Sequence, residues 1–246
     1  NCDALTVINL GNGIKTIGDS AFASCDSLKK FDIPSGVTSV GEKAFYFCNK
    51  LTRITIPSSV ISIENGAFSG CNSLKDVYFN GDITNWLDIA FVAGNANPCC
   101  NGARLYFDGE LVTDVIIPDG ITEIGSYAFY GCISIININI SGNVTFIGND
   151  AFRNCIFIII IIIGDSVSDI GEYAFYGCTA LPSVIIPNNV TSLGSYAFSG
   201  CTGLVSVVLG NGITEISDAT FFRCSALESI TFGNSISSFG AKAFNG

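Results

Sequence analysis

The sequence predicts a repeat solenoid, in which short coils stack so that a parallel β-sheet lines one face, with mostly strands and turns and little helix. Two observations predict it: nine of the 11 cysteines recur every 23 residues in two phases, and the positions between them repeat the same residue types. A unit this short cannot bury its apolar face alone, so neighbouring units must stack to close a core. The spaced cysteines are Cys2, Cys25, Cys48, Cys71, Cys132, Cys155, Cys178, Cys201 and Cys224.

The repeat is explicit when each unit is numbered from its cysteine as position 0. Ten units can be counted, starting at residues 2, 25, 48, 71, 109, 132, 155, 178, 201 and 224. Because solenoids grow by the addition of coils, we expect one domain spanning residues 1–246. In the unit from Cys178, positions 3, 6, 8, 9, 12, 15, 16, 19 and 20 hold Leu181, Val184, Ile186, Pro187, Val190, Leu193, Gly194, Ala197 and Phe198.

Each part of the unit predicts a local structure. Apolar residues at positions 6 and 8 alternate with position 7, which is the period of a strand with one buried face. Proline or glycine at position 9 ends that strand, since proline has no N–H for the ladder. Positions 12 to 15 bring a second apolar pair into the core, and glycine at position 16 permits a backbone bend. Ala-Phe at positions 19 and 20 suits a short turn or one helical turn that packs inward.

One unit carries an insertion. The unit from Cys71 has 15 extra residues, and in the stretch 84–104 the pattern dissolves into Asn, Ala, Gly and Pro, which predicts a loop. Loops that interrupt a solenoid often carry its specificity, so Trp86, the only tryptophan, and Phe91 are candidate partner-binding residues. A loop can also expose the adjacent Cys99 and Cys100, for which a plain loop role is favoured over a functional thiol pair.

The repeat resembles a known family. After Cys178 the sequence reads Leu-x-x-Val-x-Ile-Pro and then Val-x-x-Leu-Gly-x-x-Ala-Phe, and it is similar to the BspA-like class of leucine-rich repeat, the 23-residue TpLRR class, over essentially the whole chain. The resemblance implies a surface-exposed or secreted protein of a bacterium or a protist parasite that binds host, extracellular-matrix or other partner proteins in adhesion. The departures from the pattern are Gly11, Ser141, Gly164, Gly210 and Gly233 for proline, Glu64 and Ser217 for glycine, and Thr220 for alanine.

The cysteines are expected to be buried thiols. Free cysteine is among the most buried residue types, and one per coil beside Ala-Phe forms a core ladder. Zinc sites need converging ligands, usually with histidine, and this chain has no histidine. Cysteines one coil apart have parallel Cβ vectors, the wrong geometry for a disulfide. We therefore expect neither a metal nor a cofactor.

Composition excludes several functional classes. The net charge of −10 with only 11 basic residues argues against nucleic acid and anionic membranes as partners. Without histidine the usual catalytic base is missing, and the glycines follow the repeat rather than a phosphate loop, so we expect no enzyme. The apolar run Ile156–Ile163 abolishes the strand alternation, but eight residues cannot span a bilayer, which takes about 20.

Positions 4, 5 and 7 face solvent on the predicted strands and differ between the two halves of the chain. In the N-terminal half they are polar and locally basic, as at Lys29, Lys30, Arg53 and Lys75. In the C-terminal half they are largely aliphatic, which suggests a docking surface for a protein partner or another copy of the chain. Strand propensity, or a cover over this face, are the alternatives. The candidate residues are Ile116, Ile136, Ile159, Ile160, Ile162, Ile185, Val205 and Val208.

Tyrosines recur at positions 18 and 21, and Tyr173 and Tyr196 are further candidates for recognition. A stacked tyrosine ladder that finishes the coil edge is the alternative.

We therefore expect a non-catalytic protein-binding scaffold, which the resemblance places at the cell surface or outside the cell. The alternative is a structural module that self-associates through its aliphatic face into an assembly or fibre. Asn1 and Gly246 both fall at position 22, so the chain is expected to be a window of a longer protein.

Overall fold

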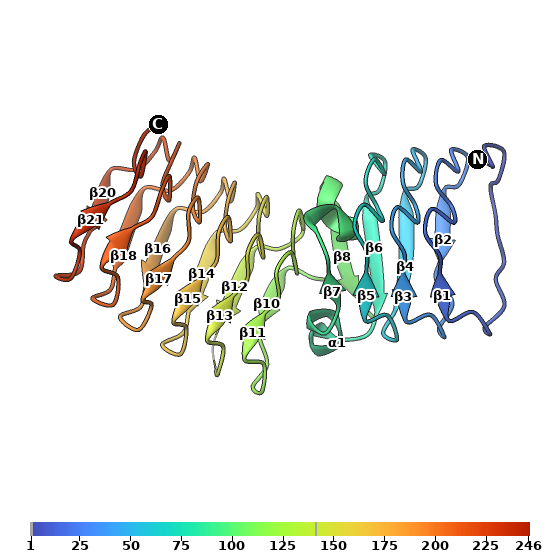
Figure 1. Cartoon of the computed structure of the whole chain (residues 1–246), viewed down its shortest axis with the longest axis horizontal. Helices are drawn as coiled ribbons and strands as arrows, with labels where there is room; N and C mark the ends of the chain where they lie inside the picture. The colour runs from blue at the N-terminus through green and yellow to red at the C-terminus, as the bar shows by residue number, and fades with distance from the viewer. Residues whose placement is uncertain (1, 141) are drawn as a thin grey trace. The chain divides into compact units, whose positions relative to one another are not determined.

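The computed structural model describes residues 2–140 and 142–246, so the proline replacement at Ser141 lies outside the described residues. It is a β-solenoid of about ten turns with parallel sheets and almost no helix, which confirms the predicted fold class (Figure 1). Its contacts define two compact units. The single domain expected over residues 1–246 stays a prediction. The N-terminal unit comprises Asn1–Val112 and Tyr127–Ser134, and the C-terminal unit Thr113–Ser126 and Ile135–Gly246.

The N-terminal unit contains two sheets, each built from one strand per coil. All strand pairs are parallel except the antiparallel β8–β9 pair. The first sheet is β2 (Lys30–Asp32), β4 (Arg53–Pro57), β6 (Asp76–Asn80), β8 (Arg104–Phe107) and β9 (Glu110–Leu111). The second sheet is β1 (Thr16–Ile17), β3 (Ser39–Val40), β5 (Ser62–Ile63) and β7 (Ala90–Phe91).

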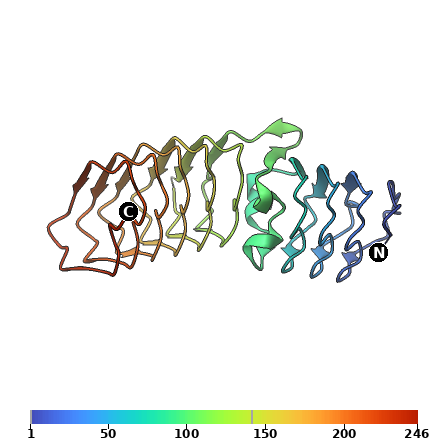
Figure 2. The ribbon, with the colours of Figure 1, turned by 90° about the horizontal axis from the view of Figure 1, so that it is seen from above.

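The C-terminal unit repeats this arrangement, and Figure 2 shows its coils lying side by side. Its first strand face holds β10 (Asp114–Ile116), β12 (Asn137–Ile140) and β14 (Ile160–Ile163), then β16 (Ser183–Ile186), β18 (Ser206–Leu209) and β20 (Ser229–Thr231). Its second face holds β11 (Glu123–Ile124), β13 (Phe146–Ile147), β15 (Asp169–Ile170) and β17 (Ser192–Leu193), then β19 (Glu215–Ile216) and β21 (Ser238–Phe239).

The isoleucine run adopts the same alternation as every other strand. In β14, Ile160 and Ile162 are exposed, whereas Ile161 and Ile163 are buried. The sequence carries no alternation here, so the register must come from the neighbouring coil, which pairs Asn137 with Ile160. A strand whose residues all look alike is thus held in register by its neighbour.

Phenylalanine and cysteine ladders form the core, as the repeat predicts. Successive rings at position 20 stack, with centroids 5.3 Å apart for Phe152 and Phe175 and 5.2 Å apart for Phe175 and Phe198. Five ladder thiols, those of Cys48, Cys71, Cys178, Cys201 and Cys224, also donate a hydrogen bond to a phenylalanine carbonyl, which the sequence did not reveal. The Cys201 Sγ donates to the carbonyl of Phe175 at 3.2 Å, and Cys178 likewise to Phe152 at 3.4 Å. A thiol at position 0 therefore satisfies a buried carbonyl of the preceding coil.

Glycine at position 16 has a different role from the predicted one. Gly41 has no positive φ, but a Cβ there would lie 2.5 Å from the Asp19 Oδ1 and 2.7 Å from the Asp19 nitrogen. The glycine therefore permits close approach of the preceding coil rather than a bend. Positive φ angles occur instead at positions 18 and 22, for example 55° at Tyr173 and 71° at Gly177.

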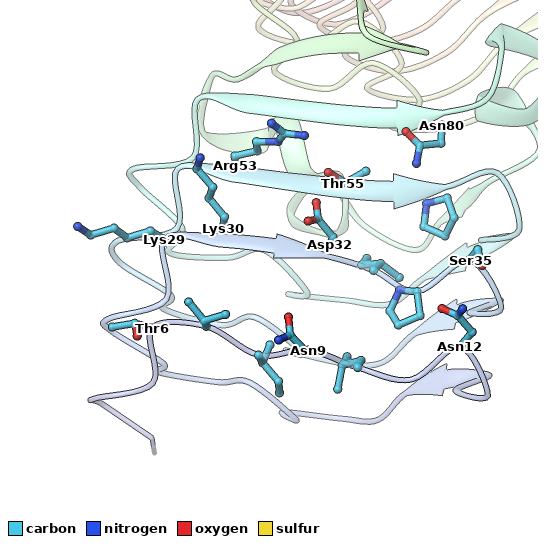
Figure 3. A pocket seen from close by; sticks show the side chains of 16 residues that line it. Thr6, Asn9, Asn12, Lys29, Lys30, Asp32, Ser35, Arg53, Thr55 and Asn80 are labelled. Atoms are coloured by element: carbon cyan, nitrogen blue, oxygen red, sulfur yellow. The ribbon is translucent and has the colours of Figure 1, made fainter.

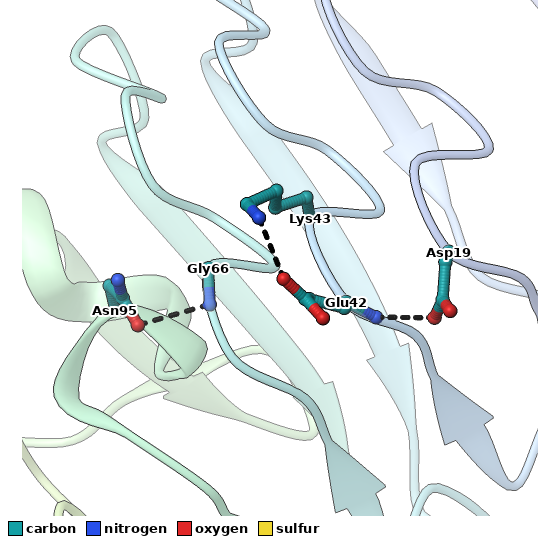
Figure 4. A network of polar contacts seen from close by, with 5 residues as sticks. All are labelled: Asp19, Glu42, Lys43, Gly66 and Asn95. Carbon is teal, nitrogen blue, oxygen red and sulfur yellow. Dashed lines mark hydrogen bonds and ion pairs between the residues drawn. The ribbon is translucent and has the colours of Figure 1, made fainter.

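Side chains in the turns link one coil to the next, as Figure 4 shows in the N-terminal unit. The Oδ1 of Asp19 accepts a hydrogen bond from the Glu42 nitrogen at 2.8 Å, and the Oδ1 of Asn95 accepts one from the Gly66 nitrogen at 3.0 Å. Glu42 also pairs with Lys43 at 2.7 Å. Turn N–H groups that no strand pairs are satisfied in this way.

The insertion is not the plain loop that the sequence predicts. It contains α1 (Ile83–Leu87), capped by Asp82, then β7, and two 3-10 turns, η1 (Gly94–Ala96) and η2 (Pro98–Asn101). Because β7 pairs with β5, the inserted chain completes the second sheet of its own coil. The insertion is thus a structured segment that contributes a strand to the second sheet.

Candidate functional site

The main candidate site is the aliphatic face of the C-terminal unit, defined as Ile116, Ile136, Ile159, Ile160, Ile162, Ile185, Val205 and Val208. All eight side chains are exposed, from 36% for Ile136 to 66% for Ile185, as the alternation predicts. They lie on or beside the five strands β10, β12, β14, β16 and β18. Successive coils present one residue beside the next, so the face is a set of rows rather than scattered single residues.

The strand register shows how these side chains are arranged. The row at position 7 runs Ile116, Asn139 and Ile162 across β10, β12 and β14. It continues from Ile185 to Val208 across β16 and β18. Asn139 interrupts the row, and its Oδ1 atom is buried without a hydrogen-bond partner among the described residues. The most apolar part of the face is therefore β14 with its neighbour β16.

The first sheet is interrupted in the middle of this face, and this interruption between β14 and β16 is called the seam. β14 pairs with β12 and β16 with β18, but β14 and β16 belong to separate sheets. In the neighbouring coils the position-4 nitrogen donates across the ladder, as Ile159 does to Ile136 at 2.9 Å and Val205 does to Pro182 at 2.8 Å. Pro182 occupies this position in β16's coil and has no N–H, so the equivalent bond to the Ile159 carbonyl cannot form.

The seam exposes apolar surface. Its groove, of about 330 Å³, is lined by Ile159–Ile163, Ser183 and Ile185. The inward-facing Ile161 and Ile163 remain 8% and 7% exposed, whereas their counterpart Ile138 in β12 is 1% exposed. The second sheet is continuous at the same coil, where Asp169 pairs with Ser192. The opening is thus confined to the aliphatic face.

Trp86 and Phe91 do not form a recognition surface, which corrects the interpretation of the insertion. Trp86 is fully buried and Phe91 is 6% exposed. The Trp86 Nε1 donates to the Ala128 carbonyl at 2.8 Å, and its ring lies 5.3 Å from that of Phe91. The insertion supplies large side chains to the core because its coil is longer and encloses more space. Their aromatic character reflects packing.

The insertion buries Cys99 and half-buries Cys100, although a loop could have exposed them. Burial raises the pKa of the Cys100 thiol to about 12, so it stays protonated at neutral pH and is a poor nucleophile. Asn97, which the sequence did not single out, is fully buried. Its Nδ2 donates to the carbonyls of Tyr127 and Ala128, both at 2.9 Å. Because Cys99 is buried and the Cys100 thiol stays protonated, a structural role is the better interpretation of the two cysteines.

The tyrosine candidates lie away from the aliphatic face, in the turns after β15 and β17. Tyr173 and Tyr196 are half-buried and stack with centroids 4.8 Å apart and planes within 5°. The Arg153 guanidinium carbon lies 5.0 Å from the centroid of Tyr173 and 4.6 Å from that of Tyr176. Since the rings are engaged with one another and with arginine, the coil-edge ladder is the better interpretation.

The ladder cysteines lie mostly in the core. Eight of them are buried, whereas Cys2 is exposed. Burial raises the pKa of the Cys178 and Cys201 thiols well above the ordinary value. In the described ranges, no three histidine, cysteine or acidic side chains come together as metal ligands would, and no helix has the length and hydrophobicity to cross a membrane.

Stacked coils with parallel sheets and almost no helix define the class of leucine-rich-repeat solenoids. The model of the BspA type leucine-rich repeat region matches residues 1–96, 103–201 and 145–246, in six copies. The chain belongs to this family. Proteins built from such repeats generally act as non-catalytic scaffolds for protein interaction. No curated protein matches the sequence.

Three solved structures are similar. A leucine-rich cell surface protein from Faecalibacterium prausnitzii A2-165 is 28% identical, with a TM-score of 0.65 over 89% of this chain and 63% of that one. A leucine-rich repeat protein from Bacteroides ovatus is 30% identical, with a TM-score of 0.61 over 100% of this chain and 71% of that one. The pneumococcal vaccine antigen PcpA, 21% identical with a TM-score of 0.60 over 91% and 62%, shares the fold. The chain thus spans less than two thirds of the Faecalibacterium and pneumococcal chains.

Proposed function

We propose that the chain is a non-catalytic scaffold whose aliphatic face binds an apolar segment of another protein. The observation that carries the proposal is the set of eight exposed isoleucine and valine side chains on five successive coils. Fully burying a wholly exposed side chain of this kind contributes about 1.5–3 kcal/mol, so each of these partly exposed side chains contributes a fraction of that. Several must be buried together to offset the cost of association, and a row across adjacent strands allows this.

The charge of the unit favours a foreign partner over a second copy. Of the 11 basic residues only Arg153, Arg223 and Lys242 lie in the C-terminal unit, against ten of the 21 acidic residues. Two copies brought face to face would repel each other, whereas a partner with basic residues beside its apolar segment would be attracted. Self-association into an assembly or fibre is therefore the second candidate.

The location and adhesive role also belong to the proposal. We place the chain at the cell surface or outside the cell, in adhesion or recognition. The support is the Faecalibacterium relative, which is described as a cell surface protein. The eight buried ladder thiols are compatible with this location, because burial protects them from oxidation.

Selection from a random peptide library tests the proposed binding. The library is displayed on phage and selected on the chain in about 0.5 M salt, where charge interactions between exposed groups are largely screened. We expect enrichment of peptides with an aliphatic or aromatic centre. Failure to enrich any apolar sequence would contradict the proposal.

Multi-angle light scattering distinguishes the two candidates. A recognition scaffold should have the 25.9 kDa mass of one chain at every concentration. A mass that rises with concentration, and falls when Ile162 is changed to Thr, would favour self-association through the same face.

A further inference from the structure

The first sheet of the N-terminal unit carries a basic row, defined as Lys29, Lys30, Arg53, Lys75 and Arg104. These are five of the 11 basic residues of an acidic chain. The strand register places them across the sheet: Lys30 pairs with Arg53, Arg53 with Asp76, and Asp76 with Arg104. Lys29 directly precedes Lys30 in the sequence, and Lys75 directly precedes Asp76. The coils therefore concentrate positive charge at the start of their strands.

This arrangement is unfavourable for the isolated fold. Lys30 and Arg53 are direct cross-strand partners, and like charges placed opposite each other destabilise a sheet. In the described part of the chain, the basic row has one ion pair, between Arg104 and Asp76 at 2.6 Å. A bound anion would relieve the repulsion between Lys30 and Arg53.

The geometry of Arg53 suits a carboxylate. Its guanidinium carbon lies 4.1 Å from the centroid of Tyr78, and Tyr78 stacks on Tyr106 at 4.4 Å. Stacking holds the guanidinium plane over the ring. The guanidinium forms no hydrogen bond to another described residue, so its donor edge is free to form the paired hydrogen bonds that carboxylates accept.

Beside the basic row lies an open groove of about 960 Å³. Figure 3 shows Lys29, Lys30 and Arg53 at one end of the strands, and Ser35, Asn12 and Asn80 at the other. These six residues all line the groove.

Thr55 also lines the groove, between these two ends. Thr55 is 8% exposed, and its hydroxyl has no hydrogen-bond partner among the described residues. Hydroxyl and amide groups of this kind pair with the backbone of an extended peptide. A buried hydroxyl without a partner is a place where a ligand can complete the hydrogen bonding.

We propose that this groove binds an acidic peptide segment, with its carboxylates on Lys29, Lys30 and Arg53 of the basic row and its backbone on the Asn and Thr side chains. A peptide fits better than a densely sulfated glycan, because the groove also offers Asn and Thr side chains that pair with backbone N–H and C=O groups. The site is in the N-terminal unit and differs in chemistry from the aliphatic face. It therefore stands or fails independently of the proposed function.

The test uses fluorescence anisotropy of a labelled peptide of alternating Glu and Gly, with the full chain at low salt. The double variant Lys30→Ser/Arg53→Ser places at position 5 the residue that Ser183, Ser206 and Ser229 hold in other coils. We expect it to weaken binding at least about tenfold. The control Lys15→Ser/Lys50→Ser removes the same charge outside the groove and should change binding less than about twofold.

A third variant and a melting curve separate binding from folding. Arg53→Lys keeps the charge but loses the planar fork, so its affinity should fall between wild type and the double variant. The thermal midpoint of the Lys30→Ser/Arg53→Ser protein should stay close to that of wild type, because removal of the like-charge pair offsets the loss of the Arg53–Tyr78 stacking.

Three results would overturn the proposal. The first is no binding of the peptide to wild type, and the second is equal weakening by both double variants, which would show dependence on net charge alone. The third is binding of a heparin-derived oligosaccharide in place of the peptide, which would assign the groove to a glycan.

Discussion

At the scale of single residues, close approach between coils decides which side chains the repeat tolerates. Gly41 leaves no room for a Cβ because the Asp19 backbone of the preceding coil lies against it. Gly18 occupies the same position in the first coil and has nothing within 4 Å of its notional Cβ. The two glycines look identical in the sequence but differ in their surroundings.

This contrast gives a matched pair of variants. We expect Gly41→Ala to lower the free energy of unfolding by about 2 kcal/mol or more, since the contacts with backbone atoms cannot relax cheaply. Gly18→Ala should be neutral or slightly stabilising, because alanine restricts the unfolded chain. Urea unfolding followed by circular dichroism measures both. Equal effects of the two changes would contradict the close-approach explanation.

The cysteines show how far residue-level prediction can go. Their spacing and composition were enough to predict buried thiols, and eight of the nine are buried. The carbonyls that five of these thiols meet were not predictable. The Cys201 Sγ bonds the Phe175 carbonyl, 26 residues earlier, and that offset depends on how one coil turns over the next.

At the scale of elements, the first sheet is interrupted between β14 and β16 by one residue, Pro182. The second sheet continues across the same coil boundary, where β15 pairs with β17. The two coils are therefore hydrogen-bonded through the second sheet but not through the first. The proline was visible in the sequence at position 4. Its consequence was not, because it follows from the ladder bond that the neighbouring coils make at that position.

Pro182→Val should close the seam by restoring an N–H that faces the Ile159 carbonyl. One added hydrogen bond is worth about 1 kcal/mol, so the amides of Ile161, Ile163 and Ile185 should exchange about fivefold more slowly. Removing proline also raises the conformational entropy of the unfolded chain, which lowers the global free energy of unfolding and masks the gain. Hydrogen exchange at these amides is therefore the appropriate measurement.

The converse change serves as the control for this prediction. Val205→Pro removes the donor to the Pro182 carbonyl and should speed exchange in β16 and β18. If neither change alters exchange at these amides, proline is not the cause of the seam.

The insertion marks the limit of prediction at this scale. Its length and position could be predicted, because the period stops and resumes. Its fold could not, since Trp86 is buried by contact with Ala128, 42 residues further along the chain. Local composition rich in Asn, Gly and Pro gave no sign of that contact.

At the scale of the molecule, the repeat separates structure from recognition. Core positions are nearly identical between coils, so they specify the solenoid and say little about its partners. The residues at positions 4, 5 and 7 vary, and alternation along a strand predicts their exposure. Thr55, at position 7, is an exception, because it is only 8% exposed. Aliphatic side chains occupy these positions in the C-terminal unit and basic ones in the N-terminal unit.

The most direct test of the account measures the affinity of a library-selected apolar peptide for wild type, for Ile162→Thr/Ile185→Thr and for Ile61→Thr. Threonine keeps the β-branched shape, and Ile61 is 59% exposed but lies outside the aliphatic face. We expect the double variant to weaken binding by at least about tenfold, and Ile61→Thr to leave it unchanged. Unchanged affinity in the double variant would contradict the assignment of the aliphatic face as the binding surface.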